Sequence, residues 1–388
     1  MRAGAGPSGS LRILVNGLSA LLGGGQTYLL NLLRRLPDDP ALRVSVLAPA
    51  ALPWTGVPRW VDRVPGPAVA RNPFVRAVWE RAELGRLAGR MGAGLLFSPG
   101  GLLPAGLPRG LATAVTFQNM LPFDAVQRAR YPLGYRRLRE ALLRSQLAAS
   151  IRRAQLVIFI SRFAREFIAG ALGPLPGDAV VVPHGVDDLF RDPALLPRPA
   201  WIPPGPYFLY VSWLDYYKSQ LELIDGFRTF CSRGGEGRLL LVGPEYRAYG
   251  DLVRRAAAAS GLGDRILVPG PRPHEELPAL YRHAAVNLFG SLTENCPNIL
   301  LEMMAAGRPC LVSNRPPMPE FGGDAVDYFD PAQPEELAGR LAALLADPAR
   351  QAELARRGPL EVAPRTWEVA ARDTWQALRA LGGAGAAA

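Results

Sequence analysis

The feature that most constrains this chain is a repeated alternation between short apolar runs and longer stretches with helical spacing of apolar residues. The runs are rich in β-branched residues and fall into two sets of six. They lie at 11–17, 43–48, 94–98, 112–118, 156–161 and 179–184, and then at 207–213, 238–243, 265–270, 286–291, 309–314 and 325–330. Buried parallel strands joined by helices have this pattern. We therefore expect an α/β fold with two doubly wound parallel sheets.

A proline-rich segment separates the two sets of runs. Residues 191–206 contain six prolines, which interrupt helices and central strands. We predict an N-terminal Rossmann-like domain over 1–190, a linker over 191–206, a second Rossmann-like domain over 207–364 and a final helix over 365–382. Because such sheets bind ligands at the carboxyl ends of their strands, we expect the two domains to face each other across a binding cleft.

The charge of the chain is concentrated in its first half. Residues 1–190 hold 23 arginines against 11 acidic residues, whereas 191–388 hold 21 basic and 23 acidic residues. Many of the arginines lie in 128–165, where leucines accompany them at helical spacing. This stretch is either a solvated face or a surface for anionic lipid or a phosphate-bearing acceptor. We do not expect nucleic acid as a partner, because no recognised binding motif or aromatic stacking platform accompanies the charge.

The composition also indicates where the protein works. There is no run of about eighteen apolar residues to span a bilayer, and residues 1–10 lack the apolar core of a signal peptide. We expect a cytoplasmic protein, peripheral to the inner face of the membrane if the basic face binds lipid. The three cysteines and three histidines are scattered, so we expect reduced thiols, no bound metal and no cofactor.

Three predicted helix starts follow predicted strands, where a ligand would bind. The first comes after 11–17 and contains Gly24 and Gly25, which would let a ligand approach the backbone and the helix N-terminus. It lacks the G-x-G-x-x-G fingerprint of dinucleotide enzymes, which argues against an oxidoreductase. The second follows 207–213 and carries Lys218, the single lysine of the chain, just before a predicted capping box, Ser219-Gln220-Leu221-Glu222. A lone lysine at such a turn suggests a phosphate site.

The third start lies between the runs 286–291 and 309–314. It places Glu294 in the loop at the end of a strand and Glu302 one to two turns inside the helix that follows, with Pro297 at the first helical position and Gly307 at the stop. Both carboxylates are then positioned to address one ligand.

With these features the chain resembles the retaining glycosyltransferases of family 4, which have the two-Rossmann architecture called GT-B. VSWLDYYKSQLELIDGF (211–227) is similar to their diphosphate-binding strand and helix, and GSLTENCPNILLEMMAAGRPCLVSN (290–314) to their E-x7-E block. VVPHGVDDLF (181–190) resembles their hinge, and RTWEVAARDTWQALRAL (365–381) the final helix that crosses back to the N-terminal domain.

The resemblance implies a role for each matching residue. Lys218 would hold the diphosphate of a nucleotide sugar, Glu302 the ribose hydroxyls, and Glu294 with the following backbone the donor sugar. Pro271 and Arg272 would lie against the base. The remaining expected contacts are Gly24, Gly25, Asn295, Asn298 and Ile299 for the donor, and Gln118 and Asn119 on the acceptor side.

Three positions depart from the family pattern. Trp213 replaces an arginine that usually pairs with the lysine, and Gln118 replaces an acceptor-side histidine. Asn295 and Pro297 replace glycines. Because proline has no N–H, the side chain of Asn295 or Asn298 would donate the missing hydrogen bond to the ligand.

The resemblance implies metal-independent transfer of a sugar, with retention of anomeric configuration, onto a cell-surface polysaccharide or a lipid-linked glycan. The positive charge of Lys218 and the helix N-termini would stabilise the leaving diphosphate. The alternatives are a nucleotide-sugar epimerase or phosphorylase of the same fold, and a non-catalytic nucleotide-sugar-binding protein.

Overall fold

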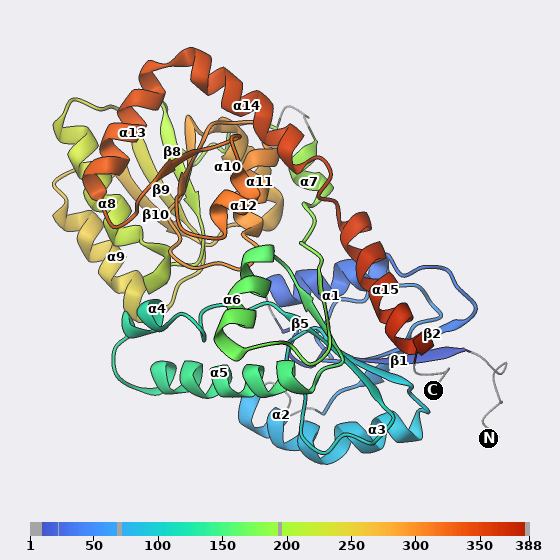
Figure 1. Ribbon diagram of the computed structural model, residues 1–388. Coiled ribbons are helices and arrows are strands. Elements are labelled where there is room, and N and C mark those ends of the chain that lie inside the picture. The colour runs from blue at the N-terminus through green and yellow to red at the C-terminus, as the bar shows by residue number, and fades with distance from the viewer. Residues whose placement is uncertain (1–9, 22, 68–71, 193–195, 385–388) are drawn as a thin grey trace. The chain divides into compact units, whose positions relative to one another are not determined.

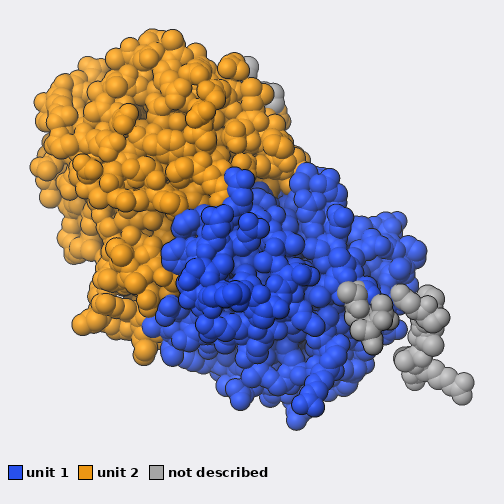
Figure 2. All heavy atoms as spheres, in the orientation of Figure 1, with its two compact units in different colours: residues 1–119, 141–184, 367–388 blue, residues 120–140, 185–366 orange. Residues whose placement is uncertain are grey.

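The computed structural model of the chain describes residues 10–21, 23–67, 72–192 and 196–384 (Figure 1). Residues 1–9 of the predicted N-terminal domain and residues 193–195 of the predicted linker lie outside the described residues. The chain divides into two compact units (Figure 2). Unit 1 consists of residues 1–119, 141–184 and 367–388, and unit 2 of residues 120–140 and 185–366.

Unit 1 is built on a seven-stranded parallel sheet with the strand order β3-β2-β1-β4-β5-β6-β7. The strands are β1 (Leu11–Asn16), β2 (Leu42–Ala48), β3 (Asp62–Pro65), β4 (Leu95–Ser98), β5 (Ala112–Phe117), β6 (Leu156–Phe159) and β7 (Asp178–Val181). The six predicted strands are confirmed. The edge strand β3 was not predicted, because its four residues are mostly exposed and give no apolar run.

The helices of unit 1 cover both faces of this sheet, as expected for a doubly wound fold (Figure 1). They are α1 (Gly24–Arg34), α2 (Pro73–Trp79), the π-helical turn η2 (Glu80–Leu84), α3 (Gly85–Arg90), α6 (Arg162–Leu172) and α15 (Trp367–Ala384); α5 (Tyr135–Arg153) begins in unit 2 and continues into unit 1. The C-terminal helix α15 packs on α1, where the indole N–H of the buried Trp375 donates to the carbonyl of Leu32 at 2.9 Å. Truncating such a side chain to alanine costs about 3–5 kcal/mol, so α15 is part of the core of unit 1.

Unit 2 contains a six-stranded parallel sheet with the order β10-β9-β8-β11-β12-β13. The strands are β8 (Tyr207–Val211), β9 (Arg238–Val242), β10 (Ile266–Gly270), β11 (Val286–Phe289), β12 (Cys310–Ser313) and β13 (Asp327–Phe329). All six were predicted from the sequence. The middle strands β8 and β11 are buried along their whole length, which explains why they appear as continuous apolar runs.

The helices of unit 2 pack around this sheet. They are α4 (Ala125–Ala129), α7 (Asp188–Arg191), α8 (Gln220–Ser232), α9 (Arg247–Ala259), α10 (Leu277–His283), α11 (Asn298–Ala305), α12 (Met318–Gly322), α13 (Pro334–Ala346) and α14 (Pro348–Val362), with 3-10 turns η3 (Tyr216–Lys218), η4 (Gly263–Arg265) and η5 (His274–Glu276). Phe208 of β8 packs edge-on against Phe227 and Phe230 of α8, so this helix buries its aromatic side chains against the sheet.

Each sheet reverses its direction of winding once, between β1 and β4 in unit 1 and between β8 and β11 in unit 2. In doubly wound sheets, ligands bind at this switch point, beyond the carboxyl ends of the two strands. The loops after β8 and β11 carry Lys218 and Glu294.

The grouping of two segments differs from the boundaries predicted from the sequence. Residues 120–140 and 185–190, which we placed in the N-terminal domain, belong to unit 2. The reason is that side chains of 120–140 contact the loop and helix after β8, a long-range association that no local pattern reveals.

Candidate donor-binding site

The loop after β8 positions the single lysine of the chain. Asp215 begins the 3-10 turn Tyr216–Lys218, and its carboxylate accepts the backbone N–H of Tyr216 at 2.8 Å. The turn directs Lys218 inward, so that its side chain is only 7% exposed. The ammonium group lies over the rings of Tyr217 and Phe289, 4.8 and 5.7 Å from their centroids.

Lys218 meets Glu294 across the switch point. The ammonium group and the carboxylate form an ion pair although the residues are 76 positions apart, and the Glu294 side chain is 15% exposed. A backbone hydrogen bond of 2.8 Å from Leu292 N–H to the carbonyl of Tyr217 ties the two loops together. Burial alone would lower the pKa of Lys218, but the Glu294 carboxylate raises it overall, so Lys218 remains charged.

The block that carries Glu294 also forms the start of α11. Asn295 is buried, and Asn298 and Ile299 are partly buried in the first turn of the helix. The helix begins at Asn298, one residue after the predicted first position Pro297. The predicted stop is confirmed, since α11 ends at Ala305 and Gly307 has a positive φ of 67°.

Glu302 lies one turn inside α11, on the same helix that begins beside Glu294. Its carboxylate accepts a hydrogen bond of 3.2 Å from the hydroxyl of Tyr281. Burial raises the pKa of Glu302 to about 8, and nearby Asp187 adds to this shift while the hydrogen bond opposes it. An acceptor with a raised pKa is suited to a ligand that brings hydroxyl donors, because those hydrogen bonds stabilise the ionised form.

The expected capping box at the start of α8 is wrong. Ser219 has left-handed backbone angles, φ 58° and ψ 32°, and its side chain makes no capping hydrogen bond. An N-cap serine needs an extended backbone to reach the amide groups of the first turn, and the 3-10 turn before Ser219 prevents it. Among the described residues, Ser219 is the only non-glycine with positive φ, and its buried hydroxyl has no hydrogen-bond partner there.

The end of β10 contributes a contact that sequence reasoning missed. The guanidinium of Arg272 lies over the indole ring of Trp201, 4.1 Å from its centroid, while the preceding Pro271 is exposed. Trp201 belongs to the predicted linker, so its proximity to Arg272 was not visible in the sequence. A stacked arginine beside an exposed proline offers a flat surface for a planar group.

The remaining predicted residues lie in unit 1. Gly24 and Gly25 are the first residues of α1, where a Cβ added at either position would meet open space. Gln118 and Asn119 follow β5, and the Gln118 amide donates to the carbonyl of Pro99 at 2.6 Å. Gly24 and Gly25 are thus at the switch point of that sheet, and Gln118 and Asn119 are at the same carboxyl edge.

The basic stretch 128–165 exposes less of its arginine charge than the sequence suggested. Arg136 and Arg139 both pair with the buried Glu140, and Arg153 donates to the carbonyl of Leu103, so these arginines satisfy internal partners. The exposed side of the stretch is instead partly apolar. Large exposed hydrophobic residues along it are Leu133, Tyr135, Leu138 and Leu142.

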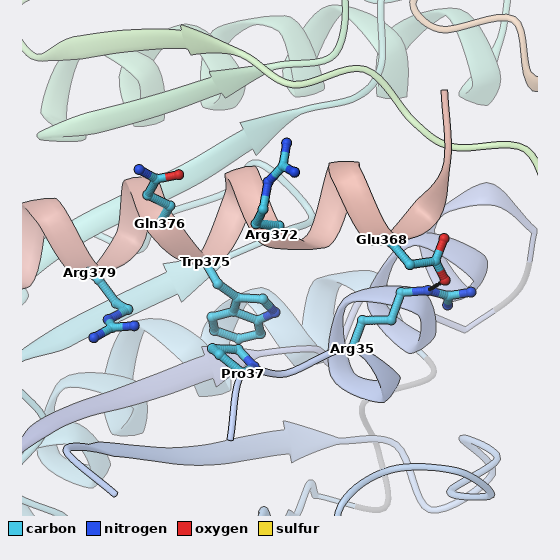
Figure 3. A pocket seen from close by; sticks show the side chains of 7 residues that line it. All are labelled: Arg35, Pro37, Glu368, Arg372, Trp375, Gln376 and Arg379. Atoms are coloured by element: carbon cyan, nitrogen blue, oxygen red, sulfur yellow. Dashed lines mark hydrogen bonds and ion pairs between the residues drawn. The ribbon is translucent and has the colours of Figure 1, made fainter. Parts of the chain in front are cut away.

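A separate cavity of about 570 Å³ lies in unit 1 beside α15 (Figure 3). It is lined by Arg35, Pro37, Glu368, Arg372, Trp375, Gln376 and Arg379. Each arginine already has an acidic partner: Arg35 pairs with Glu368, Arg372 with Asp373, and Arg379 with Asp39. The charges are balanced, so this cavity is not suited to a diphosphate.

No three histidine, cysteine or acidic side chains gather to hold a metal ion within the part of the chain that the structure describes. Within the same residues, no helix combines the length and apolar character needed to cross a bilayer.

Two family models match complementary parts of the chain. Residues 22–188 match "Glycosyltransferase Family 4", and residues 197–360 match "Glycosyl transferases group 1". The chain belongs to glycosyltransferase family 4. The two sheets, with their topology and the loops after β8 and β11, therefore form a GT-B fold.

Relatives of known activity are similar over most of the chain. The O-antigen chain mannosyltransferase B of Escherichia coli is 27% identical over 71% of this chain and 72% of its own length. A GDP-mannose-dependent alpha-(1-6)-phosphatidylinositol monomannoside mannosyltransferase of Mycolicibacterium smegmatis is 29% identical over 58% of this chain and 59% of its own length.

A solved structure supports the same fold. HepE of Anabaena, crystallised in complex with UDP and glucose, superposes with a TM-score of 0.70 at 18% identity, covering 95% of this chain and 99% of HepE. At this identity the likeness establishes the architecture alone.

Proposed function

We propose that this glycosyltransferase transfers a sugar from a nucleotide-diphosphate donor bound at the switch point of unit 2. The observation that supports this most is the convergence of Lys218, Glu294 and Glu302 on the loops and helix that follow β8 and β11. In this proposal Lys218 binds the diphosphate, Glu294 the sugar and Glu302 the ribose, while Pro271 and Arg272 contact the base. The two mannosyltransferase relatives, one of them GDP-mannose-dependent, favour mannose as the sugar and GDP as one base to test.

The proposed reaction proceeds with retention and without a metal. As the bond between the anomeric carbon and the phosphate oxygen breaks, its electron pair leaves with the diphosphate, and the acceptor oxygen forms a new bond on the same face. The acceptor proton passes to the departing phosphate, so the protein need not supply a base. The charge of Lys218 stabilises the leaving group where negative charge increases, and its buried setting strengthens that interaction.

For the acceptor, we propose a lipid-linked glycan or cell-surface polysaccharide reached from a membrane surface. Exposed Leu138 and Leu142 lie four residues apart on one side of α5, with exposed Arg144 nearby. Apolar side chains flanked by arginine suit the boundary between lipid head groups and acyl chains. Gln118 and Asn119 remain the predicted acceptor-side residues.

The first experiment is a thermal-shift screen against nucleotides and nucleotide sugars. A ligand present at 100 times its dissociation constant adds about 2.7 kcal/mol to the free energy of unfolding. The hit is then incubated with and without lipid extract as acceptor. Conversion of the donor to a different sugar without acceptor would favour an epimerase, and release of a sugar phosphate from a glycan by inorganic phosphate would favour a phosphorylase. Binding without turnover would identify a non-catalytic protein.

A further inference from the structure

Residues 120–140 leave the sheet of unit 1 after β5 but pack as part of unit 2. The largest of their buried side chains is Tyr131, which is 2% exposed. Its hydroxyl donates to Oδ1 of Asp215 at 2.8 Å. Burial and the Asp215 carboxylate both raise the pKa of Tyr131, so the hydroxyl remains a proton donor in this hydrogen bond.

The same carboxylate oxygen shapes the turn that ends at Lys218. Oδ1 of Asp215 accepts the N–H of Tyr216 at 2.8 Å, and the Asp215 carbonyl accepts the N–H of Lys218 at 2.9 Å. Asp215 is itself buried, at 6% exposure. One buried residue therefore connects the Tyr131 hydroxyl to the backbone that positions the lysine.

Two further contacts hold the segment to the same region. Arg130 forms an ion pair with Glu222 in the first turn of α8, four residues after Lys218. The guanidinium of Arg136 lies 5.3 Å from the ring centroid of Tyr131 and 3.8 Å from Oδ2 of Asp215. Residues 120–140 thus contact side chains both before and after Lys218 in the sequence.

The turn needs this support, because its own conformation is unfavourable. Ser219, directly after Lys218, is held at φ 58° with its buried hydroxyl unpaired among the described residues. A left-handed backbone is unfavourable for a non-glycine residue and persists only where its surroundings impose it. An electrostatic group contributes most to catalysis when its position is set before the reaction begins.

We propose that Tyr131 and Asp215 are positioning residues, which hold the Tyr216–Lys218 turn so that the lysine is aimed at the donor diphosphate. The inference rests on the proposed function, since it assigns Lys218 to that group. It adds that a segment from the N-terminal half of the sequence, continuous with the acceptor-side residues Gln118 and Asn119, determines the geometry of the donor site.

The test compares two tyrosines that each lose one buried hydroxyl. Tyr131→Phe removes the hydrogen bond to Asp215, whereas the matched control Tyr207→Phe removes a 2.7 Å hydrogen bond to the Leu280 carbonyl at the opposite end of β8. Binding of GDP and UDP is measured by calorimetry, with thermal unfolding of every variant. We expect similar losses in Tm for both variants, but a 3- to 10-fold weaker nucleoside diphosphate affinity for Tyr131→Phe alone.

A second pair of variants at position 215 separates positioning from general stability. Asn at 215 keeps an oxygen that accepts the hydrogen bonds of Tyr216 and Tyr131, so Asp215→Asn should retain most of the affinity that Asp215→Ala loses. Equal affinities for Tyr131→Phe, Tyr207→Phe and wild type would overturn the positioning role while leaving the donor site in place. Wild-type protein that binds neither GDP nor UDP nor any nucleotide sugar would instead overturn the proposed function, and this inference with it.

Discussion

The ion pair between Lys218 and Glu294 leads to an unusual expectation for the variant Glu294→Gln. In the structure the Glu294 carboxylate neutralises Lys218, and both side chains are largely buried. A nucleoside diphosphate must displace that carboxylate from the lysine before its own phosphates can take its place. Removing the charge of Glu294 should therefore strengthen binding of the nucleoside diphosphate, although the residue is part of the proposed site.

The size of the effect follows from the geometry. Two opposite charges about 4 Å apart interact by about 4 kcal/mol at an effective dielectric constant of 20. Solvent access to Glu294 and partial replacement by the glutamine amide reduce this, so we expect about 1.4 kcal/mol, or roughly tenfold tighter binding of GDP or UDP. The nucleotide sugar should gain less, because its sugar loses the Glu294 carboxylate as a hydrogen-bond acceptor.

Calorimetry of the nucleoside diphosphate and the nucleotide sugar on both proteins measures this difference. The matched control is Glu245→Gln, which removes a carboxylate paired with Arg254 on the surface of the same unit. That variant should leave both affinities unchanged. If Glu294→Gln binds the nucleoside diphosphate no more tightly than wild type, Glu294 does not compete for Lys218 and the reasoning fails.

Further predictions concern the pKa of Glu302, the strained turn, metal and the membrane. The pKa of Glu302 is about 8 in the folded protein, above its ordinary value of 4.5, so ionisation disfavours folding and the free energy of unfolding should fall as pH rises through this window. Urea unfolding should show that the free energy of unfolding of Glu302→Gln rises relative to that of wild type between pH 5.5 and 8. A difference between the two free energies that stays constant with pH would contradict the shifted pKa. Ser219→Gly should raise the free energy of unfolding by about 1 kcal/mol by relieving the left-handed strain, and destabilisation would show that Ser219 is not strained. Transfer should survive a chelator; loss that magnesium or manganese restores would refute the metal-independent proposal. Replacing Leu138 and Leu142 with serine should weaken binding to anionic liposomes, and unchanged binding would assign this face to solvent.

The sequence predicted the strands well because each central strand is buried on both faces. The runs that became β8 and β11 are fully buried, and their apolar residues are therefore continuous in the sequence. The exposed edge strand β3 carries no such signal. The helix end at Gly307 was predictable for a different reason, since a glycine at positive φ is a local requirement of the backbone.

Features that depend on contacts between distant residues were not predictable. The sequence placed Lys218 and Glu294 in loops that follow strands, but it revealed neither their pairing, which requires β8 and β11 to be neighbours in the sheet, nor the left-handed backbone at Ser219. Nor did the sequence reveal that Arg272 stacks on Trp201, or that Tyr131 hydrogen-bonds to Asp215. In each case the two segments are far apart in the sequence, and the local sequence pattern of neither segment indicates the contact.

The central claim is that Lys218 acts on the leaving diphosphate of a nucleotide sugar, and one measurement tests it most directly. A radiolabelled nucleotide sugar chosen by the thermal-shift screen is incubated with bacterial lipid extract, and transfer of label is followed for wild type and Lys218→Ala. We expect kcat to fall 10²- to 10³-fold in the variant, roughly 2.7–4 kcal/mol, with a smaller loss of donor binding, because the interaction strengthens as charge develops. Transfer by Lys218→Ala at a rate near that of wild type would contradict the claim.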